Sequence, residues 1–408
     1  MSLPPIRRAI LPLARRGCLR AWALGAAMAL AGLAGCGGGG SDPVPVPPPP
    51  PVVITGPGTL KESTQVAALS LADIAAAWPG GGATGLPAAP RYAVDAYRLT
   101  YLTTDGQGRE VTASGLVAVP RKAAGVPSPV LGYQHGTTFR DAEAPSNRVI
   151  ATEPPLALAS LGYLVVAADY VGYGASKGQA HPYLQAAPTA AAVVDFLTAA
   201  RTWRQREGVA DNGQLFLAGY SEGGYATVAA HRALQAAGSS HLAQLQASVA
   251  GAGPLDVTLT LNTLLERVRR DNPLIAGLIS PGLLRNLGST VRAEVRRQLV
   301  RAAVPDDADV RVQADFIDRY LADDTAALDR DSNVHDWAPA APLWLFHGRD
   351  DQTVPYGVST HALQAMRARG ATGVALDDCA ASPSSHLGCV APYFAFLLSR
   401  LSGVARDL

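Results

Sequence analysis

The chain has 408 residues and a formal net charge of +1, so it is long enough for one large domain with an insertion and carries no charge excess of either sign. Aromatic residues make up only 6% of the chain and no basic stripe is interleaved with them, which argues against nucleic-acid binding. The sequence has no internal repeat and no second long apolar stretch after the N-terminal one, so it indicates neither a repeat protein nor several membrane spans.

The N-terminal region has the pattern of a secretory signal. A basic segment precedes an apolar stretch, residues 21–33, that is short for a membrane span. The stretch ends in Leu-Ala-Gly-Cys at residues 33–36, which resembles a bacterial lipobox. This resemblance implies that residues 1–35 are a signal peptide, that Cys36 is lipidated, and that the chain is anchored to a membrane of the bacterial cell envelope. The alternatives are a signal with an incidental cysteine, or a transmembrane anchor.

Residues 36–58 read as a tether between this signal and a domain at 59–408. Four glycines, residues 37–40, predict a flexible segment, and the proline tract at 43–51 predicts a semi-rigid polyproline spacer. Such a tether would hold a domain away from a membrane surface. A leader without a role is the alternative.

The domain begins with a predicted antiparallel hairpin, residues 92–104 and 111–120, joined by a turn at 105–108. Short apolar runs then alternate with helical patterns. The predicted strands are 129–133, 164–168, 215–218, 247–250, 343–346 and 374–376, and the predicted helices are 155–161, 187–204, 225–237, 358–369 and 390–401. This alternation predicts an α/β fold with a mostly parallel sheet and helices on both faces.

The segment Gly219-Tyr220-Ser221-Glu222-Gly223 is the most informative motif. It lies between a predicted buried strand and a predicted helix, which is where a nucleophilic serine on a sharp turn is expected. Ser176 has the same glycine spacing, but no helical pattern follows it and Pro182 comes soon after, so we interpret it as a loop serine. Ser221 is therefore the candidate nucleophile.

Residues 255–339 interrupt the alternation of strands and helices. They contain the helix-like stretches 259–270, 292–303 and 312–321 but no convincing strand. Because the segment lies between two predicted strands, we expect a helical cap above the carboxyl edge of the sheet, where ligand sites of open α/β sheets form. We expect the arginines of this segment to lie on a helix face exposed to solvent. Contact with an anionic surface is the alternative.

A serine nucleophile needs a histidine base oriented by a carboxylate, and on such a sheet the chain order is serine, acid, histidine. The loop 347–355 follows a predicted strand and carries Asp350 and Asp351, either of which could be the acid or could cap the next helix. Of the later histidines, His361 lies within a helical pattern and is expected to be structural. His386 lies in a loop between Cys379 and Cys389 and is the candidate base.

In an exported chain Cys379 and Cys389 are expected to form a disulfide that constrains this loop, with two free buried thiols as the alternative. Two backbone N–H donors are also needed for the developing oxyanion. We expect one from Glu222 and one from the loop 134–138, where Thr137 is favoured over its neighbours Gly136 and Thr138. His135 precedes Ser221 and is expected to support that loop.

The loop 134–138, the segment 219–223, the loop 347–355 and His386 follow one another in this order along the chain. With these motifs the chain closely resembles the α/β-hydrolase superfamily over about residues 92–401. In that superfamily the acid loop commonly reads His-Gly-x-x-Asp-x-x-Val-Pro, a register that favours Asp351 over Asp350. The segment 169–174, the Gly-Tyr-Ser-Glu-Gly-Gly sequence and the helical insertion resemble the secretory lipase and esterase branch.

This resemblance implies an α/β-hydrolase fold with a helical cap and no need for a metal or cofactor. It also implies hydrolysis of small-molecule or lipid carboxylic esters through an acyl-enzyme formed on Ser221, with His386 as base and Asp351 as its orienting acid. A serine peptidase on the same fold and a tethered, non-catalytic binding protein are the alternatives.

Overall fold

The computed structural model describes residues 54–77, 88–271, 280–303 and 307–408. The predicted signal peptide, Cys36 and most of the predicted tether lie outside the described residues. At the domain end of that tether, the Gly58 N–H donates to the carbonyl of Leu102 at 2.7 Å, so this part of the chain already contacts the sheet. Within the described ranges, no helix is long and apolar enough to cross a membrane.

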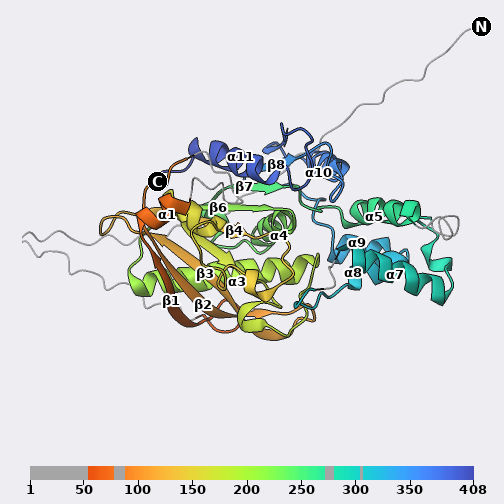
Figure 1. The fold of residues 1–408 in the computed structure, drawn as a ribbon, viewed down its shortest axis with the longest axis horizontal. Coiled ribbons are helices and arrows are strands. Elements are labelled where there is room, and N and C mark those ends of the chain that lie inside the picture. Colours follow the sequence, from red (N-terminus) through yellow and green to blue (C-terminus); the bar gives the residue numbers. More distant parts are fainter. Residues whose placement is uncertain (1–53, 78–87, 272–279, 304–306) are drawn as a thin grey trace, which may run out of the picture. The chain divides into compact units, whose positions relative to one another are not determined.

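A nine-stranded sheet forms the centre of the domain, in the order β1-β2-β3-β5-β4-β6-β7-β8-β9 (Figure 1). In this spatial order, the pairs from β1 to β5 are antiparallel and the pairs from β5 to β9 are parallel. The sheet is therefore mostly parallel, as expected. The strands are β1 (Leu60–Leu69), β2 (Val94–Thr104), β3 (Glu110–Pro120), β4 (Ser128–Gln134), β5 (Leu164–Ala168), β6 (Asp211–Tyr220), β7 (Leu245–Gly251), β8 (Leu343–His347) and β9 (Val374–Asp378).

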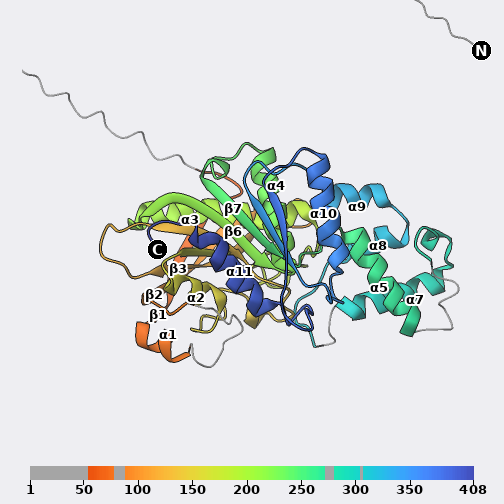
Figure 2. The same ribbon diagram turned by 90° about the horizontal axis from the view of Figure 1, so that it is seen from above.

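Helices cover both faces of this sheet. Along β4, Leu131 packs in a core cluster with α1, α2 and α11, whereas its neighbour Val130 packs with α3 and α4, because successive side chains of a strand point to opposite faces. Figure 2 shows α2 and α11 over one face. The helices are α1 (Leu71–Ala77), α2 (Pro154–Ser160), α3 (Ala186–Glu207), α4 (Glu222–Ala236), α10 (Tyr356–Ala368) and α11 (Val390–Ser402).

The chain between β7 and β8 forms a helical insertion, visible in both views (Figures 1 and 2). It contains α5 (Val257–Asp271), α7 (Ser289–Ala303), α8 (Asp315–Leu321) and α9 (Thr325–Asp331). Leu261, Leu299 and Phe316 from three of these helices are buried in one core cluster, so the insertion has an apolar interior of its own that continues into the sheet layer. At its surface Arg296 pairs with Asp318 at 2.6 Å, which satisfies that arginine within the insertion.

Candidate active site

Ser221 lies on a strained turn between β6 and α4. Its φ of 58° and ψ of −123° fall in a region that residues other than glycine rarely adopt, so surrounding contacts must hold it there. The Ser221 N–H donates to the Gly251 carbonyl at 2.8 Å, and its own carbonyl accepts from the Tyr225 N–H at 3.1 Å. The turn therefore presents the Ser221 hydroxyl at the carboxyl edge of the sheet.

The two glycines of the motif are required by close backbone approach. A Cβ atom on Gly219 would lie 2.3 Å from the carbonyl oxygen of Gly223, and one on Gly223 would lie 2.1 Å from that of Gln134. Both distances are far below van der Waals contact. Ser176 is in a different setting: it is buried in a short 3-10 helix, and its hydroxyl donates to the Tyr173 carbonyl at 2.8 Å. Glycine is required at Gly174 as well, where φ is 54°, so the two motifs differ in the setting of the serine and not in the need for glycine.

The structure brings Ser221, His386 and Asp351 together. His386 Nε2 lies 2.8 Å from Ser221 Oγ, and His386 Nδ1 lies 2.6 Å from Asp351 Oδ2. A carboxylate only accepts hydrogen bonds, so Nδ1 carries the proton and Nε2 is left as an acceptor for the Ser221 hydroxyl. In this arrangement the His386 ring contacts the serine hydroxyl and the Asp351 carboxylate orients that ring.

The two adjacent aspartates contact different parts of the histidine loop. Asp350 Oδ2 accepts from both the backbone N–H and the hydroxyl of Ser384, each at 2.9 Å. Asp351 instead reaches the His386 ring, while its other oxygen accepts from the N–H groups of Thr353 and Val354 at 2.8 and 2.9 Å. Asp350 therefore fixes the loop that carries His386, and Asp351 fixes the ring.

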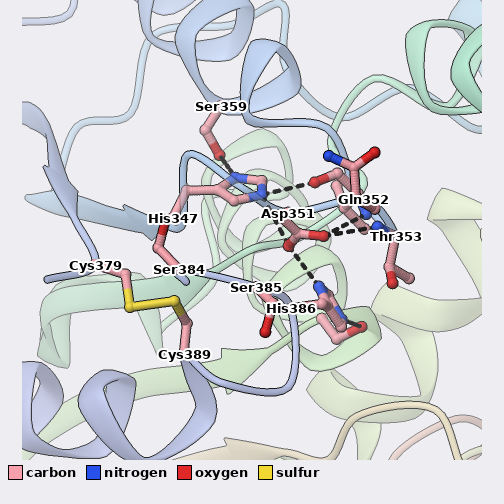
Figure 3. A network of polar contacts seen from close by, with 12 residues as sticks. His347, Asp351, Gln352, Thr353, Ser359, Cys379, Ser384, Ser385, His386 and Cys389 are labelled. Carbon is pink, nitrogen blue, oxygen red and sulfur yellow. Dashed lines mark hydrogen bonds and ion pairs between the residues drawn. A yellow bond between two sulfur atoms is a disulfide. The ribbon is translucent and has the colours of Figure 1, made fainter. Parts of the chain in front are cut away.

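Buried hydrogen bonds keep Asp351 ionised. Burial alone raises the pKa of its carboxyl, but hydrogen bonds from His347 and His386 outweigh burial and hold the pKa well below its ordinary value. His347 is fully buried; its Nε2 lies 2.9 Å from the Val354 carbonyl and 3.2 Å from Asp351 Oδ2, and its Nδ1 lies 2.7 Å from the Ser359 hydroxyl (Figure 3). His347 is thus a second partner of Asp351 and contacts the same carboxylate oxygen, Oδ2, as His386.

The loop that carries His386 is fixed at several points. A disulfide joins Cys379 to Cys389, as the sequence predicts (Figure 3). The Tyr220 hydroxyl donates to the His386 carbonyl at 2.7 Å, which links the loop to the residue before the nucleophile. A Cβ atom on Gly348 would lie 2.0 Å from the Ser384 carbonyl oxygen, so glycine is required where the acid loop meets the histidine loop.

One of the two predicted oxyanion donors, Thr137, borders the same space as Ser221, and the other, Glu222, directly follows Ser221 in the chain. Thr137 lies with Ser221 in the lining of one pocket, and neither its N–H nor that of Glu222 donates to another residue in the described parts of the chain. His135 is buried, with its Nε2 3.2 Å from the Asp169 carbonyl and its Nδ1 2.8 Å from that of Gly136. That position agrees with the expected support of the loop.

The Glu222 side chain makes a buried contact that the sequence did not indicate. Its Oε1 lies 2.7 Å from His181 Nε2, and both side chains are almost completely buried. The other ring nitrogen of His181 lies 2.9 Å from the Val171 carbonyl, so it must carry a proton. This contact holds the residue after Ser221 in place.

A pocket of about 520 Å³ opens at Ser221 and His386. Apolar side chains from three helices of the insertion line one part of it: Val257, Leu261 and Leu264 of α5, Leu299 of α7, and Phe316 and Ile317 of α8. The pocket is large enough for a small molecule or an acyl chain.

Sequence reasoning placed the predicted nucleophile, acid, base and disulfide at positions that the structure brings together. It did not identify Tyr220, His181 or Ser384 as supporting residues, because their partners are distant in the chain. His347 offered one signal: it is the first residue of the acid-loop motif, at the end of a strand.

The comparisons with known proteins agree with this architecture. A family model described as serine aminopeptidase, S33, matches residues 154–379, more than half of the chain. No match is found among the curated proteins.

Several solved structures share the fold. The rice cell wall degrading esterase LipA from Xanthomonas oryzae matches with a TM-score of 0.67 at 24% identity, over 86% of this chain and 100% of that one. A putative hydrolase from Legionella pneumophila matches with a TM-score of 0.66 at 22% identity, over 84% and 97%. Candida antarctica lipase A in its closed state matches with a TM-score of 0.54 at 17% identity, over 86% and 84%. The expected α/β-hydrolase fold is confirmed.

Proposed function

This chain belongs to the serine aminopeptidase S33 family of hydrolases, and on that premise we propose that it hydrolyses carboxylic esters through Ser221, His386 and Asp351. The observation that carries the proposal is the continuous hydrogen-bonded line from Ser221 Oγ through His386 to Asp351, with distances of 2.8 and 2.6 Å. These are the contacts that a serine nucleophile, its base and an orienting acid need.

In the proposed reaction, His386 Nε2 takes the proton of Ser221 as the serine oxygen attacks the ester carbonyl. The N–H groups of Thr137 and Glu222 stabilise the oxyanion of the tetrahedral intermediate. His386 then gives its proton to the departing alcohol, which leaves an acyl group on Ser221. Water attacks this acyl-enzyme with His386 again as base, so that the carboxylic acid is released and Ser221 is regenerated.

The lining of the pocket supports an ester with an apolar acyl group. Six side chains of the insertion that face it are aliphatic or aromatic. The esterase and lipase among the structures of similar fold are consistent with this substrate class. We therefore place the acyl chain against α5, α7 and α8, and the helical insertion acts as the cap that sets acyl chain length.

A peptidase is the second candidate, because the matching family is described as a serine aminopeptidase. Amide and ester hydrolysis use the same three residues, but an aminopeptidase must also bind a free ammonium group. Two carboxylates, Glu143 and Glu153, line the pocket, and Glu153 is paired with Arg148 at 2.7 Å. This pairing leaves Glu153 less suited to bind an ammonium group, so Glu143 is the carboxylate that an aminopeptidase would use here.

The test compares p-nitrophenyl esters from acetate to palmitate with aminoacyl p-nitroanilides. The proposal expects ester turnover that falls by about 10⁴-fold or more in Ser221→Ala. Faster turnover of the anilides than of the esters would favour the peptidase. No turnover of either class by the folded protein would leave a binding protein as the better account.

Leu264 tests the role of the insertion in chain length. Leu264→Trp fills the pocket and is expected to lower kcat/KM for long acyl chains more than for acetate, whereas the volume-conserving Leu264→Met should leave the preference almost unchanged. An equal loss for all chain lengths in Leu264→Trp would contradict this role, as would an unchanged preference after replacement of the whole insertion.

Export as a lipoprotein is also proposed, and it rests on the sequence of residues 1–36 alone. The test expresses the full chain in bacteria and measures incorporation of labelled palmitate, with Cys36→Ala as control. We expect label and membrane association that depend on Cys36. Equal labelling of the variant would contradict lipidation at this residue.

A further inference from the structure

Three metal-ligating side chains meet where the insertion joins the sheet layer. Asp256, His335 and His361 each offer one ligand atom, and these atoms all lie within 4.8 Å of one another. Asp256 and His335 are more than nine-tenths buried, whereas the His361 side chain is about half exposed. None of the three lines the pocket at Ser221.

The hydrogen bonds around this cluster leave ligand atoms available. His335 Nδ1 lies 3.3 Å from the Leu255 carbonyl, so it carries the proton and Nε2 keeps its lone pair. Asp256 Oδ1 accepts from the Leu259 N–H at 2.9 Å, which orients the carboxylate. Its Oδ2 accepts from His361 Nδ1 at 2.8 Å, and a metal ion between these two atoms would replace the proton that they share.

The other histidines have different contacts. In the described residues, His135, His181, His231, His241 and His347 are buried against protein partners, and His386 faces Ser221. The rings of His335 and His361 instead face each other, with centroids 4.8 Å apart. Two imidazoles beside one buried carboxylate are a ligand set for a metal ion.

We propose that Asp256, His335 and His361 form a Zn²⁺ site at the base of the helical insertion. Two imidazole nitrogens and one carboxylate oxygen suit Zn²⁺, which binds such ligands in tetrahedral geometry, with water as the fourth ligand here. Ca²⁺ and Mg²⁺ prefer oxygen ligands and fit the set poorly.

The position of the cluster gives the ion a structural role. Asp256 directly precedes α5 at the entrance to the insertion, His335 follows α9 at its exit, and His361 lies on α10 in the sheet layer. The entrance and exit already touch, since the Val334 N–H donates to the Leu255 carbonyl at 2.9 Å. A bound ion links both the entrance and the exit of the insertion to α10 and so fixes the base of the insertion.

The first test measures Zn²⁺ binding to the full chain after removal of metal with a chelator, by calorimetric titration with ZnCl₂. Wild type is expected to bind one Zn²⁺ per chain at this site. In His361→Gln the Kd should rise at least about tenfold, because a metal ligand is lost. The matched control is Gln364→Ala, an exposed residue on the same helix, which should leave the Kd unchanged.

A second readout is thermal stability. Zn²⁺ should raise the Tm of metal-free wild type and of Gln364→Ala, because it binds the folded state. It should not raise the Tm of His361→Gln or His335→Gln. The absence of Zn²⁺ binding by wild type, or an unchanged Kd in His361→Gln, would overturn the proposal. The latter result would place any bound ion elsewhere, for example at His386.

Discussion

Asp350 and Asp351 are neighbours in the sequence but hold different groups. Asp351 contacts the His386 ring. Asp350 instead contacts the backbone and the hydroxyl of Ser384, which lies two residues before His386. The difference arises because the backbone turns here: the N–H groups of Thr353 and Val354 bind Asp351 Oδ1 and aim its Oδ2 at the histidine. At the scale of single residues, one carboxylate orients the His386 ring and the other positions the loop that carries it.

This division predicts unequal effects of two matched substitutions. Asp351→Asn should lower kcat for ester hydrolysis by about 10⁴-fold, because an amide no longer holds the imidazole in the tautomer that accepts the serine proton. Asp350→Asn keeps one acceptor for Ser384 and should lower kcat by less than about tenfold. Steady-state kinetics of the two variants check this prediction. Losses of equal size, or a larger loss in Asp350→Asn, would contradict it.

The sequence could predict Ser221 and His386 because each motif is local and the chain order leaves few choices. The local sequence could not decide between Asp350 and Asp351, because both follow the same strand. Only the resemblance to the acid-loop pattern of the superfamily favoured Asp351. The contact between Glu222 and His181 was not predictable, because it joins residues 41 positions apart.

The loop between Cys379 and Cys389 is the element that positions His386. Its disulfide closes a ring with a sequence separation of 10, and the loop is also fixed by Asp350 and by the Tyr220 hydroxyl. Because these two hydrogen bonds do not depend on the disulfide, its loss should weaken the placement of His386 without abolishing it.

We therefore expect the double variant Cys379→Ala/Cys389→Ala to fold and to lose about 2–3 kcal/mol of unfolding free energy through the greater entropy of the unfolded chain. Its kcat should fall by about tenfold, far less than in Asp351→Asn, because part of the preorganisation remains. Urea unfolding and ester kinetics measure both effects, and reduction of wild type with dithiothreitol should reproduce them. Unchanged kcat in the double variant would show that the disulfide does not position His386.

At the scale of elements, the buried strands were predictable because their apolar runs are continuous. The predicted range 164–168 coincides with β5, and 343–346 ends one residue short of β8. The edge strand β1 was missed because most of its side chains are exposed and its polar residues form one run, 61–65, so it shows no alternation. The helices α1 and α9 were missed because they bury few side chains, only Ile74 in α1 and only Ala327 and Leu328 in α9, so neither shows a clear apolar period.

At the scale of the whole molecule, the order of the strands could not be predicted from local patterns. β5 lies between β3 and β4, so chain order and spatial order differ there, and only the long-range pairing decides it. The class of fold was nevertheless predictable, because alternating strands and helices allow few arrangements.

The stability of the whole domain should depend on pH through its buried histidines. Burial lowers the pKa of His231 to about 4, and burial with the nearby Arg201 and Arg204 lowers that of His241 to about 3. The unfolded chain protonates histidine near pH 6.5, so below that pH it binds more protons than the folded state and the free energy of unfolding falls. For each such histidine, the free energy of unfolding changes by about 1.4 kcal/mol per pH unit.

His231→Phe tests this effect, because it keeps a ring against Trp337 and removes the titrating group. Between about pH 6.5 and pH 4, the free energy of unfolding of the variant should fall less steeply than that of wild type, by the contribution of one histidine. Above pH 7.5 the two curves should run parallel. Urea unfolding of both proteins across this pH range measures the two curves. Curves that are parallel at low pH as well would contradict a contribution from His231.

The most direct test of the account is covalent trapping of the nucleophile in the full chain. A p-nitrophenyl alkylphosphonate reacts with an activated serine and forms a stable adduct that mass spectrometry can locate. We predict release of one p-nitrophenol per chain, an adduct on Ser221, and neither in Ser221→Ala. An adduct on another residue such as Ser176, or equal labelling of Ser221→Ala, would contradict the central claim that Ser221, activated by His386 and Asp351, is the nucleophile of this hydrolase.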